Sequence, residues 1–448
     1  MLNTTPSTNV QVVDQIISAR WIAPVEPTNV VLEKHAVVLH QGKIVALLPI
    51  DEALARYQAS EHIALDDHVL IPGLVNTHTH AAMSLLRGLG DDLPLMDWLK
   101  KRIWPAEKQL VSPHFVADGT RLACAEMLRG GITTFADMYF FPRQAIEAAQ
   151  EMGLRIACGL TVMDFATAWA SDADDYLSKG LAIRDEFART ERVSFCLAPH
   201  APYSVNDRAL ERIAMLAEQL DLPIHMHVHE TVAEIEQSQR DYGMRPLARL
   251  NQLGLLSPRL MAVHAVHLNT EELDLLALNN CAIVHCPTSN MKLGSGITPL
   301  AEMQNLGLRI GLGTDGAASN NRLDILQEMQ FAGLLAKAIS HNAGICTAHQ
   351  CLHMATLGGA MALGLDHQIG SITPGKAADL CAIDLGDDPM LQPCHDPVSQ
   401  IMYVAGREQV SHVWVEGRLQ LAAGQPLLYD KEQLLAVQRI WQTSLNSL

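Results

Sequence analysis

Two histidines two positions apart are the residues of this chain best suited to chemistry. His78 and His80 follow the apolar, β-prone run Val69–Ile71. Side chains two apart on a strand point to the same face, so both imidazoles can reach one point at a strand end. Converging imidazoles suit a metal such as zinc. Because a chain with 20 histidines contains such pairs by chance, the rest of the sequence has to support this interpretation.

Eight short apolar runs that resemble strands alternate with amphipathic stretches between about residues 69 and 365. Strands that alternate with helices predict a parallel sheet, and eight is the number that closes a (β/α)8 barrel. The runs are Val69–His80, Gly131–Asp137, Arg155–Leu160, Val193–His200, Leu222–Glu230, Leu260–His267, Ala282–Cys286 and Leu308–Asp315. The clearest helical stretches are Ala117–Arg129, Asp207–Leu220, Val232–Gly243, Glu271–Leu278 and Leu323–Ser340.

Polar residues support the barrel, because they lie at the carboxyl ends of these runs. Active sites of such barrels are built at that face. An open doubly wound sheet would favour a Gly-rich first turn, and no G-x-G-x-x-G motif follows an early strand. The polar residues are His78, His80, Asp137, His200, His225, His227, Glu230, His264, His267, His285 and Asp315.

The two ends of the chain differ from its middle. Gln11–Leu70 and Ile369–Gln420 contain short strands with Gly-centred turns and few helix signals. We therefore expect an α/β protein with a TIM-type (β/α)8 barrel over residues 69–368. Residues 1–68 and 369–448 would together form a small β-sandwich domain, the second part ending in a helix.

Composition excludes several classes of function. The 448 residues are 48% hydrophobic and carry a net charge of −17, which disfavours binding to nucleic acid or to an anionic membrane. The nine cysteines are scattered without a C-x-x-C pair, as expected for reduced core thiols in a cytoplasmic protein. Met1–Gln11 has no pattern of a secretory signal, and no apolar run approaches 18 residues.

A set of motifs spread along the chain in order resembles the amidohydrolase superfamily. Within it, the sequence is similar to the 5′-methylthioadenosine/S-adenosylhomocysteine deaminase family. The resemblance covers essentially the whole chain and implies the same barrel. The motifs are Pro72–His80, Ala198–Tyr203, His225–Thr231, His264–Leu268, Cys286–Asn290, Gly313–Gly316 and Gly370–Leu380.

The resemblance implies one divalent metal per subunit, most simply zinc, at strand ends. Its ligands would be His78, His80, His227 and Asp315. Spacing alone does not choose His227, because His225 and His229 share its strand face. The family pattern, a histidine three residues before the glutamate, selects His227 and leaves His225 as a supporting residue. Two-metal relatives carry a carbamylated lysine in the fourth strand, and Val193–His200 contains no lysine.

The resemblance also implies the residues that move protons. Glu230 would carry a proton between water and a ring nitrogen of the substrate; the alternative is an ordinary acid at a helix start. His264 would orient the water or polarise the tetrahedral centre, with His267 as its rival. Asp315 would also accept the proton of the water. Bound zinc lowers the pKa of water to about 7.

Substrate contacts follow from the same resemblance. Glu107 matches a glutamate that binds ribose hydroxyls, although it could be a solvated acid at a helix start. His200 matches a histidine beside the substrate, and Glu230 and Asp315 would also contact it. Some relatives carry arginines after the third strand, whereas Gly159–Asp175 has none. This difference favours a neutral alkylthio tail on the substrate.

The sequence thus predicts a cytoplasmic, metal-dependent deaminase. Its substrate would be a small nucleoside, 5′-methylthioadenosine or also S-adenosylhomocysteine or adenosine, and its products the inosine analogue and ammonia. The family suggests a homo-oligomer, a dimer or tetramer. The alternatives on the same scaffold are a guanine or 8-oxoguanine deaminase and a triazine hydrolase. Glu230, His264 and an open position on the metal argue against a non-catalytic barrel with a structural zinc, because structural sites are normally closed by four ligands.

Overall fold

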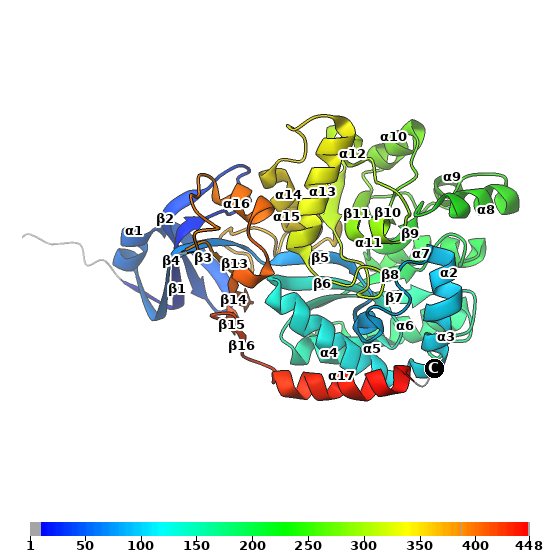
Figure 1. The fold of residues 1–448 in the computed structure, drawn as a ribbon, viewed down its shortest axis with the longest axis horizontal. Helices are drawn as coiled ribbons and strands as arrows, with labels where there is room; N and C mark the ends of the chain where they lie inside the picture. Colours follow the sequence, from blue (N-terminus) through cyan, green and yellow to red (C-terminus); the bar gives the residue numbers. More distant parts are fainter. Residues whose placement is uncertain (1–9, 387, 447–448) are drawn as a thin grey trace, which may run out of the picture.

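The computed structural model describes residues 10–386 and 388–446, and its strands form two separate sheets (Figure 1). The larger body is a barrel of eight parallel strands in sequence order, so the predicted fold class is confirmed. The barrel strands are β5 (Leu74–Thr79), β6 (Ile132–Tyr139), β7 (Arg155–Val162), β8 (Val193–Pro199), β9 (Ile224–Val228), β10 (Leu260–His264), β11 (Ala282–His285) and β12 (Arg309–Leu312).

Hydrogen bonds join β5 to β12 and to the residues that follow it, and so bring the two ends of the barrel sheet together. The Thr77 hydroxyl donates to the Leu312 carbonyl at 2.7 Å, and the backbone N–H of Asp315 donates to the His78 carbonyl at 3.0 Å. A barrel has no free strand edge. The closure therefore places residues from the two ends of the barrel sequence side by side at its mouth.

Apart from α1 (Ile50–Arg56), which packs against the second sheet, helices lie around the barrel strands and bury most of the hydrophobic core against them (Figure 1). In the first half of the chain the helices are α1 (Ile50–Arg56), the 3-10 helix η1 (Ala81–Leu86), α2 (Leu95–Trp98), the π-helix η2 (Leu99–Ile103), α3 (Trp104–Leu110), α4 (Pro113–Arg129), α5 (Pro142–Glu151), α6 (Ala173–Phe187) and α7 (Asp207–Leu220). They continue with α8 (Val232–Tyr242), α9 (Pro246–Gln252), α10 (Thr270–Leu278), α11 (Pro287–Lys292), α12 (Leu300–Asn305), α13 (Ile325–Ser340), α14 (Ala348–Ala355), α15 (Leu357–Ala362), α16 (Pro397–Tyr403), the 3-10 helix η3 (Arg407–Gln409) and α17 (Lys431–Leu445).

The second sheet is built from both ends of the chain, as expected. Its order is β16-β15-β14-β13-β4-β1-β2-β3, with β4 parallel to β1 and antiparallel to β13. At the bottom of the view in Figure 1, α17 lies along α4, where the rings of Phe115 and Trp441 meet edge to face. The strands are β1 (Gln11–Ile22), β2 (Leu32–His40), β3 (Lys43–Pro49), β4 (Tyr57–Pro72), β13 (Leu380–Asp384), β14 (Val410–Val415), β15 (Arg418–Ala422) and β16 (Gln425–Pro426).

One expected strand is divided in the structure. The run Val69–His80 was predicted as a single barrel strand, but Val69–Ile71 belong to β4 of the second sheet and the barrel begins at Leu74. Gly73 separates the two strands. A Cβ atom there would lie 2.2 Å from the Thr133 hydroxyl, so the chain passes this point only without a side chain. The short apolar run alone did not reveal this break.

The structure bears on the expected state of the cysteines and on the expected absence of a membrane span. All nine cysteines are free thiols, and eight of them are buried. Among the described residues, none of the helices combines the length and the apolar character that a membrane crossing requires. The expected absence of a secretory signal concerns mainly residues 1–9, which lie outside the described residues.

Close packing behind the barrel mouth depends on Gly119. This residue lies in α4 where it crosses η1, the segment that directly follows His80. A Cβ atom at Gly119 would lie 2.3 Å from the Ala82 carbonyl oxygen. Because backbone cannot give way as a side-chain tip can, any larger residue has to push α4 away from η1.

We therefore expect Gly119→Ala to lower the free energy of unfolding by about 1–3 kcal/mol, the usual cost of overpacking. Gly130→Ala is the matched control. It lies at the end of the same helix with φ −95°, and its Cβ would meet nothing closer than 3.5 Å. Urea or thermal unfolding measures both variants. Equal stability of the two would contradict the importance of this contact.

Candidate active site

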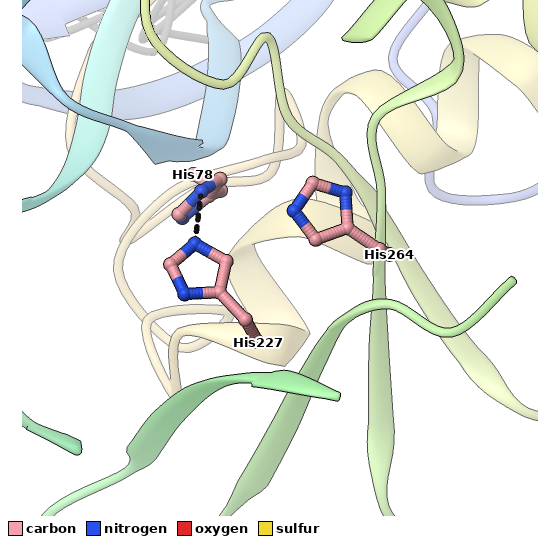
Figure 2. A group of neighbouring side chains, drawn as sticks. All are labelled: His78, His227 and His264. Carbon is pink, nitrogen blue, oxygen red and sulfur yellow. Dashed lines mark hydrogen bonds between the residues drawn. The ribbon is translucent and has the colours of Figure 1, made fainter. Parts of the chain in front are cut away.

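Four side chains from the carboxyl ends of three barrel strands converge at one point, and we call them the donor cluster. His78 belongs to β5 and His80 follows it. His227 belongs to β9, and Asp315 follows β12. Nε2 of His78 lies 3.2 Å from Nε2 of His227 and 3.4 Å from Oδ1 of Asp315. Nε2 of His80 lies 3.3 Å from the same Oδ1. Figure 2 shows His78 and His227 facing each other.

The spacing within the donor cluster fits one divalent cation. Zinc is bound by imidazole nitrogens at about 2.0–2.1 Å, and donor atoms at the corners of such a tetrahedron are about 3.3 Å apart. The separations of 3.2, 3.3 and 3.4 Å match that edge length. Imidazoles and a carboxylate are also donors that zinc accepts.

The second ring nitrogen of each histidine in the donor cluster has its own partner. Nδ1 of His80 donates to the Met138 carbonyl at 2.6 Å, and Nδ1 of His227 donates to the His200 carbonyl at 2.7 Å. Nδ1 of His78 lies 3.0 Å from Nε2 of His225. Such partners fix the tautomer and leave Nε2 free to bind a metal. His225 is thus placed behind His78, where the resemblance put a supporting residue.

Burial keeps these imidazoles neutral. It lowers the pKa of His78 to about 4 and that of His227 well below the ordinary value. A neutral imidazole is the form that binds a metal, so both rings are ready at pH 7 without losing a proton.

Hydrogen bonds hold both carboxylate oxygens of Asp315. Ser289 Oγ donates to its Oδ2 at 2.6 Å, and the Gly316 N–H donates to its Oδ1 at 2.7 Å.

Glu230 and His264 lie next to each other beside the donor cluster. Nε2 of His264 is 3.9 Å from Oε2 of Glu230, and its ring stacks on His227 at 5.4 Å between centroids (Figure 2). Nδ1 of His264 lies 2.8 Å from Oδ1 of Asn290, which holds the ring in place. Burial raises the pKa of Glu230 above its ordinary value, so its carboxyl group can hold a proton closer to neutral pH.

The rival histidines lie elsewhere. Nε2 of His267 bonds to the Ser295 carbonyl at 2.7 Å, and Nδ1 of His229 bonds to the His267 carbonyl at 3.1 Å. His229 also has a left-handed backbone, with φ +56°, which ends the alternation of side chains along β9. Spacing alone could not separate His225, His227 and His229, and this backbone turn is what separates the last of them.

Sequence reasoning missed Glu234, which supports the turn before α8. Its two carboxylate oxygens accept the backbone N–H groups of His229 and Glu230, each at 2.9 Å. Glu234 is 5% exposed, and burial raises its pKa to about 7. An acid three residues after a helix cap such as Thr231 is typical of the first turn of any helix. The sequence therefore gave no sign that Glu234 supports the active site.

The residues expected to contact substrate lie on the same side of the barrel. His200 follows β8, and its ring centroid lies 4.9 Å from that of His227. Glu107 comes from α3, where Oε1 of its carboxylate accepts a 2.7 Å hydrogen bond from Tyr139. Burial raises the pKa of Glu107 to about 6, against the opposing effect of this bond. A solvated acid at a helix start would show neither feature.

The chain matches known proteins over its full length. The amidohydrolase family profile matches residues 69–419. A 5-methylthioadenosine/S-adenosylhomocysteine deaminase of Teredinibacter turnerae is 42% identical over 440 residues, which cover 98% of this chain and 99% of that protein. A protein of the same name from Saccharophagus degradans is 42% identical over 447 residues, 100% of this chain and 99% of that protein.

Solved structures agree with these relatives. An adenosine deaminase from Xanthomonas campestris with bound zinc is similar at a TM-score of 0.97 and 45% identity, covering 98% of this chain and 100% of that one. An atrazine chlorohydrolase from Arthrobacter aurescens complexed with zinc gives a TM-score of 0.89 at 25% identity, covering 95% and 99%. The chain therefore belongs to the amidohydrolase family and, within it, to the 5-methylthioadenosine/S-adenosylhomocysteine deaminases.

Proposed function

We propose that this chain is a metal-dependent aminohydrolase that converts 5′-methylthioadenosine to its inosine analogue and ammonia. The observation that carries the proposal is the pairing of two sites around one barrel mouth. One is the donor cluster with Glu230 and His264 beside it, and the other is the carboxylate of Glu107. The first suits hydrolysis of an amidine, and the second suits a vicinal diol.

We infer that the donor cluster holds one divalent cation, with zinc as the best fit to its spacing. When bound, such a cation acts as a Lewis acid and makes water a stronger acid near neutral pH. The side chains orient this site through the hydrogen bonds to their outer atoms. The barrel strand β8, which lacks a lysine, offers no bridging ligand for a second ion, and this supports a single metal.

The proton movements of the reaction can be assigned to two carboxylates. In hydrolysis, the water oxygen bonds to the amidine carbon, one water proton goes to the adjacent ring nitrogen, and the other leaves with the amine as ammonia. Glu230, with its raised pKa, would carry the first proton. Asp315 would accept the second and pass it to the amine. His264, whose Nδ1 donates to Asn290, would orient the attacking water through Nε2.

We further propose that 5′-methylthioadenosine is preferred over S-adenosylhomocysteine. Residues 159–175, from the end of β7 to the first turn of α6, contain neither Arg nor Lys. The next cation along the chain, Lys179, is already bonded to the Trp169 carbonyl and to Asp175. A carboxylate on the substrate tail would therefore lack a partner here, whereas a methylthio group needs none.

Triazine hydrolysis is the second candidate, supported by the 25% identical chlorohydrolase. A triazine has no ribose, so it would make no use of the carboxylate of Glu107. This difference decides between the two candidates. A homo-oligomeric state and a cytoplasmic location stay predictions.

The zinc-loaded protein is expected to release ammonia from 5′-methylthioadenosine, with kcat/KM about tenfold or more above that for S-adenosylhomocysteine, because an unpaired buried charge is costly. Loss of adenine absorbance and an ammonia assay follow the reaction, with guanine and atrazine as comparison substrates. Chelation should stop turnover and added zinc should restore it. Ammonia from none of the adenosine derivatives would refute the proposal.

Glu230→Gln should lower kcat by about 10²–10⁴-fold, the usual contribution of a general acid–base, because the amide cannot carry the proton. Metal content should stay the same, since Glu230 is outside the donor cluster. Glu236→Gln is the control, an exposed acid in the helix that follows. Full activity of Glu230→Gln would remove this residue from the mechanism.

Glu107→Gln should raise KM for adenosine and 5′-methylthioadenosine by about 10–100-fold with little change in kcat. A hydrogen bond to a charged group contributes about 1.5–3 kcal/mol, which the neutral amide largely loses. 2′,3′-Dideoxyadenosine, which has no diol, should be unaffected. Equal losses for substrates with and without the diol would instead assign Glu107 a structural role.

A further inference from the structure

Tyr139 contacts the carboxylate of Glu107, and the mechanism proposed above gives this tyrosine no role. It is the last residue of β6 and is 6% exposed. Its hydroxyl donates to Oε1 of Glu107 at 2.7 Å, and this is the one hydrogen bond to that carboxylate among the described residues. The other oxygen, Oε2, is left for a ligand.

The two residues come from different kinds of element. Glu107 lies on α3, a short helix that follows the π-helix η2 in the long connection between β5 and α4. Tyr139 lies on a barrel strand, where it pairs with Leu160 of β7 and its carbonyl accepts the Thr161 hydroxyl at 3.0 Å. The tyrosine is therefore held by strand pairing, whereas the helix that carries the glutamate has no such ladder.

The same strand end also orients the donor cluster. The Met138 carbonyl accepts Nδ1–H of His80, and the next residue holds Glu107. The ring centroids of Tyr139 and His80 are 6.4 Å apart. Two neighbouring residues of β6 thus set the distance between the metal side of the site and the diol side.

The phenol suits this position chemically. A carboxylate binds a vicinal diol best when its plane is fixed so that its lone pairs face both hydroxyls. One hydrogen bond from a rigid donor fixes that plane and leaves lone pairs free on both oxygens. Burial raises the pKa of Tyr139 well above its ordinary value, so the phenol remains a donor throughout the working pH range.

We propose that Tyr139 is the positioning residue that aligns Glu107 with the ribose diol and thereby sets the preference of the enzyme for nucleosides with an intact diol. The proposal rests on the proposed function, because it presumes an adenosine-type substrate. It predicts a loss of discrimination without a loss of chemistry, since the Tyr139 hydroxyl bonds to Glu107 and not to the donor cluster, Glu230 or His264.

The test is Tyr139→Phe in the zinc-loaded protein, with adenosine and 2′,3′-dideoxyadenosine as substrates. KM for adenosine should rise about tenfold, as for one lost charge-assisted hydrogen bond, while kcat stays within about threefold. KM for the dideoxy compound should not change. Combined with Glu107→Gln, the tyrosine substitution should add less than a twofold effect, because its target is already gone.

Tyr429→Phe is the matched control. Tyr429 precedes α17, and its hydroxyl donates to the Ala125 carbonyl of α4 and to no residue of the site, so its removal should leave the ratio of the two substrates unchanged. Melting temperature and zinc content are measured for every variant. An equal fall in kcat for both substrates, or an unchanged KM for adenosine, would overturn the role of Tyr139. Inactivity of the wild type toward all adenosine derivatives would instead overturn the function itself.

Discussion

The closure of the barrel between β12 and β5 is the constraint on which the site depends. The bond from the Asp315 amide to the His78 carbonyl joins a carboxylate and an imidazole from opposite ends of the barrel sequence. Asn76 strengthens the same seam: its side chain accepts the Thr314 N–H at 3.0 Å and donates to the Thr314 hydroxyl at 2.8 Å, across 238 positions of sequence. These groups are buried, so water does not compete for the bonds.

The backbone around the site is strained, and hydrogen bonds from neighbouring residues hold it in place. His229, His264 and Asp315 all have left-handed backbones, with φ of +56°, +70° and +61°. Such residues cost on the order of 1–3 kcal/mol each and persist only where neighbouring bonds hold them. Here Glu234 holds the first turn and Asn290 the second side chain. At His264 and Asp315 the left-handed backbone places the side chain at the site, whereas at His229 it accompanies a side chain that bonds to the His267 carbonyl instead.

The sequence predicted the barrel and the types of the converging residues, because periodicity and the polar strand ends are local signals. It identified the helix Asp207–Leu220 with its observed limits. It missed the break at Gly73 and the support by Glu234, because both depend on atoms distant in sequence or on backbone angles. The position of Tyr139 was within reach of the same reasoning. It lies two residues after Asp137 on the same strand face, but we expected the strand to end at Asp137, whereas it continues to Tyr139. The roles of the individual site residues stay predictions.

The position of β4 in the second sheet has a consequence for biosynthesis. One of its edges pairs with β1, which precedes it, and the other with β13, which follows the entire barrel. A ribosome delivers the N-terminal strands first, at about 5–20 residues per second. Until β13 emerges, β4 presents an open row of amides and carbonyls on which a neighbouring nascent chain can add a strand. The second sheet therefore keeps one edge of β4 unpaired until the strand that follows the whole barrel has been synthesised.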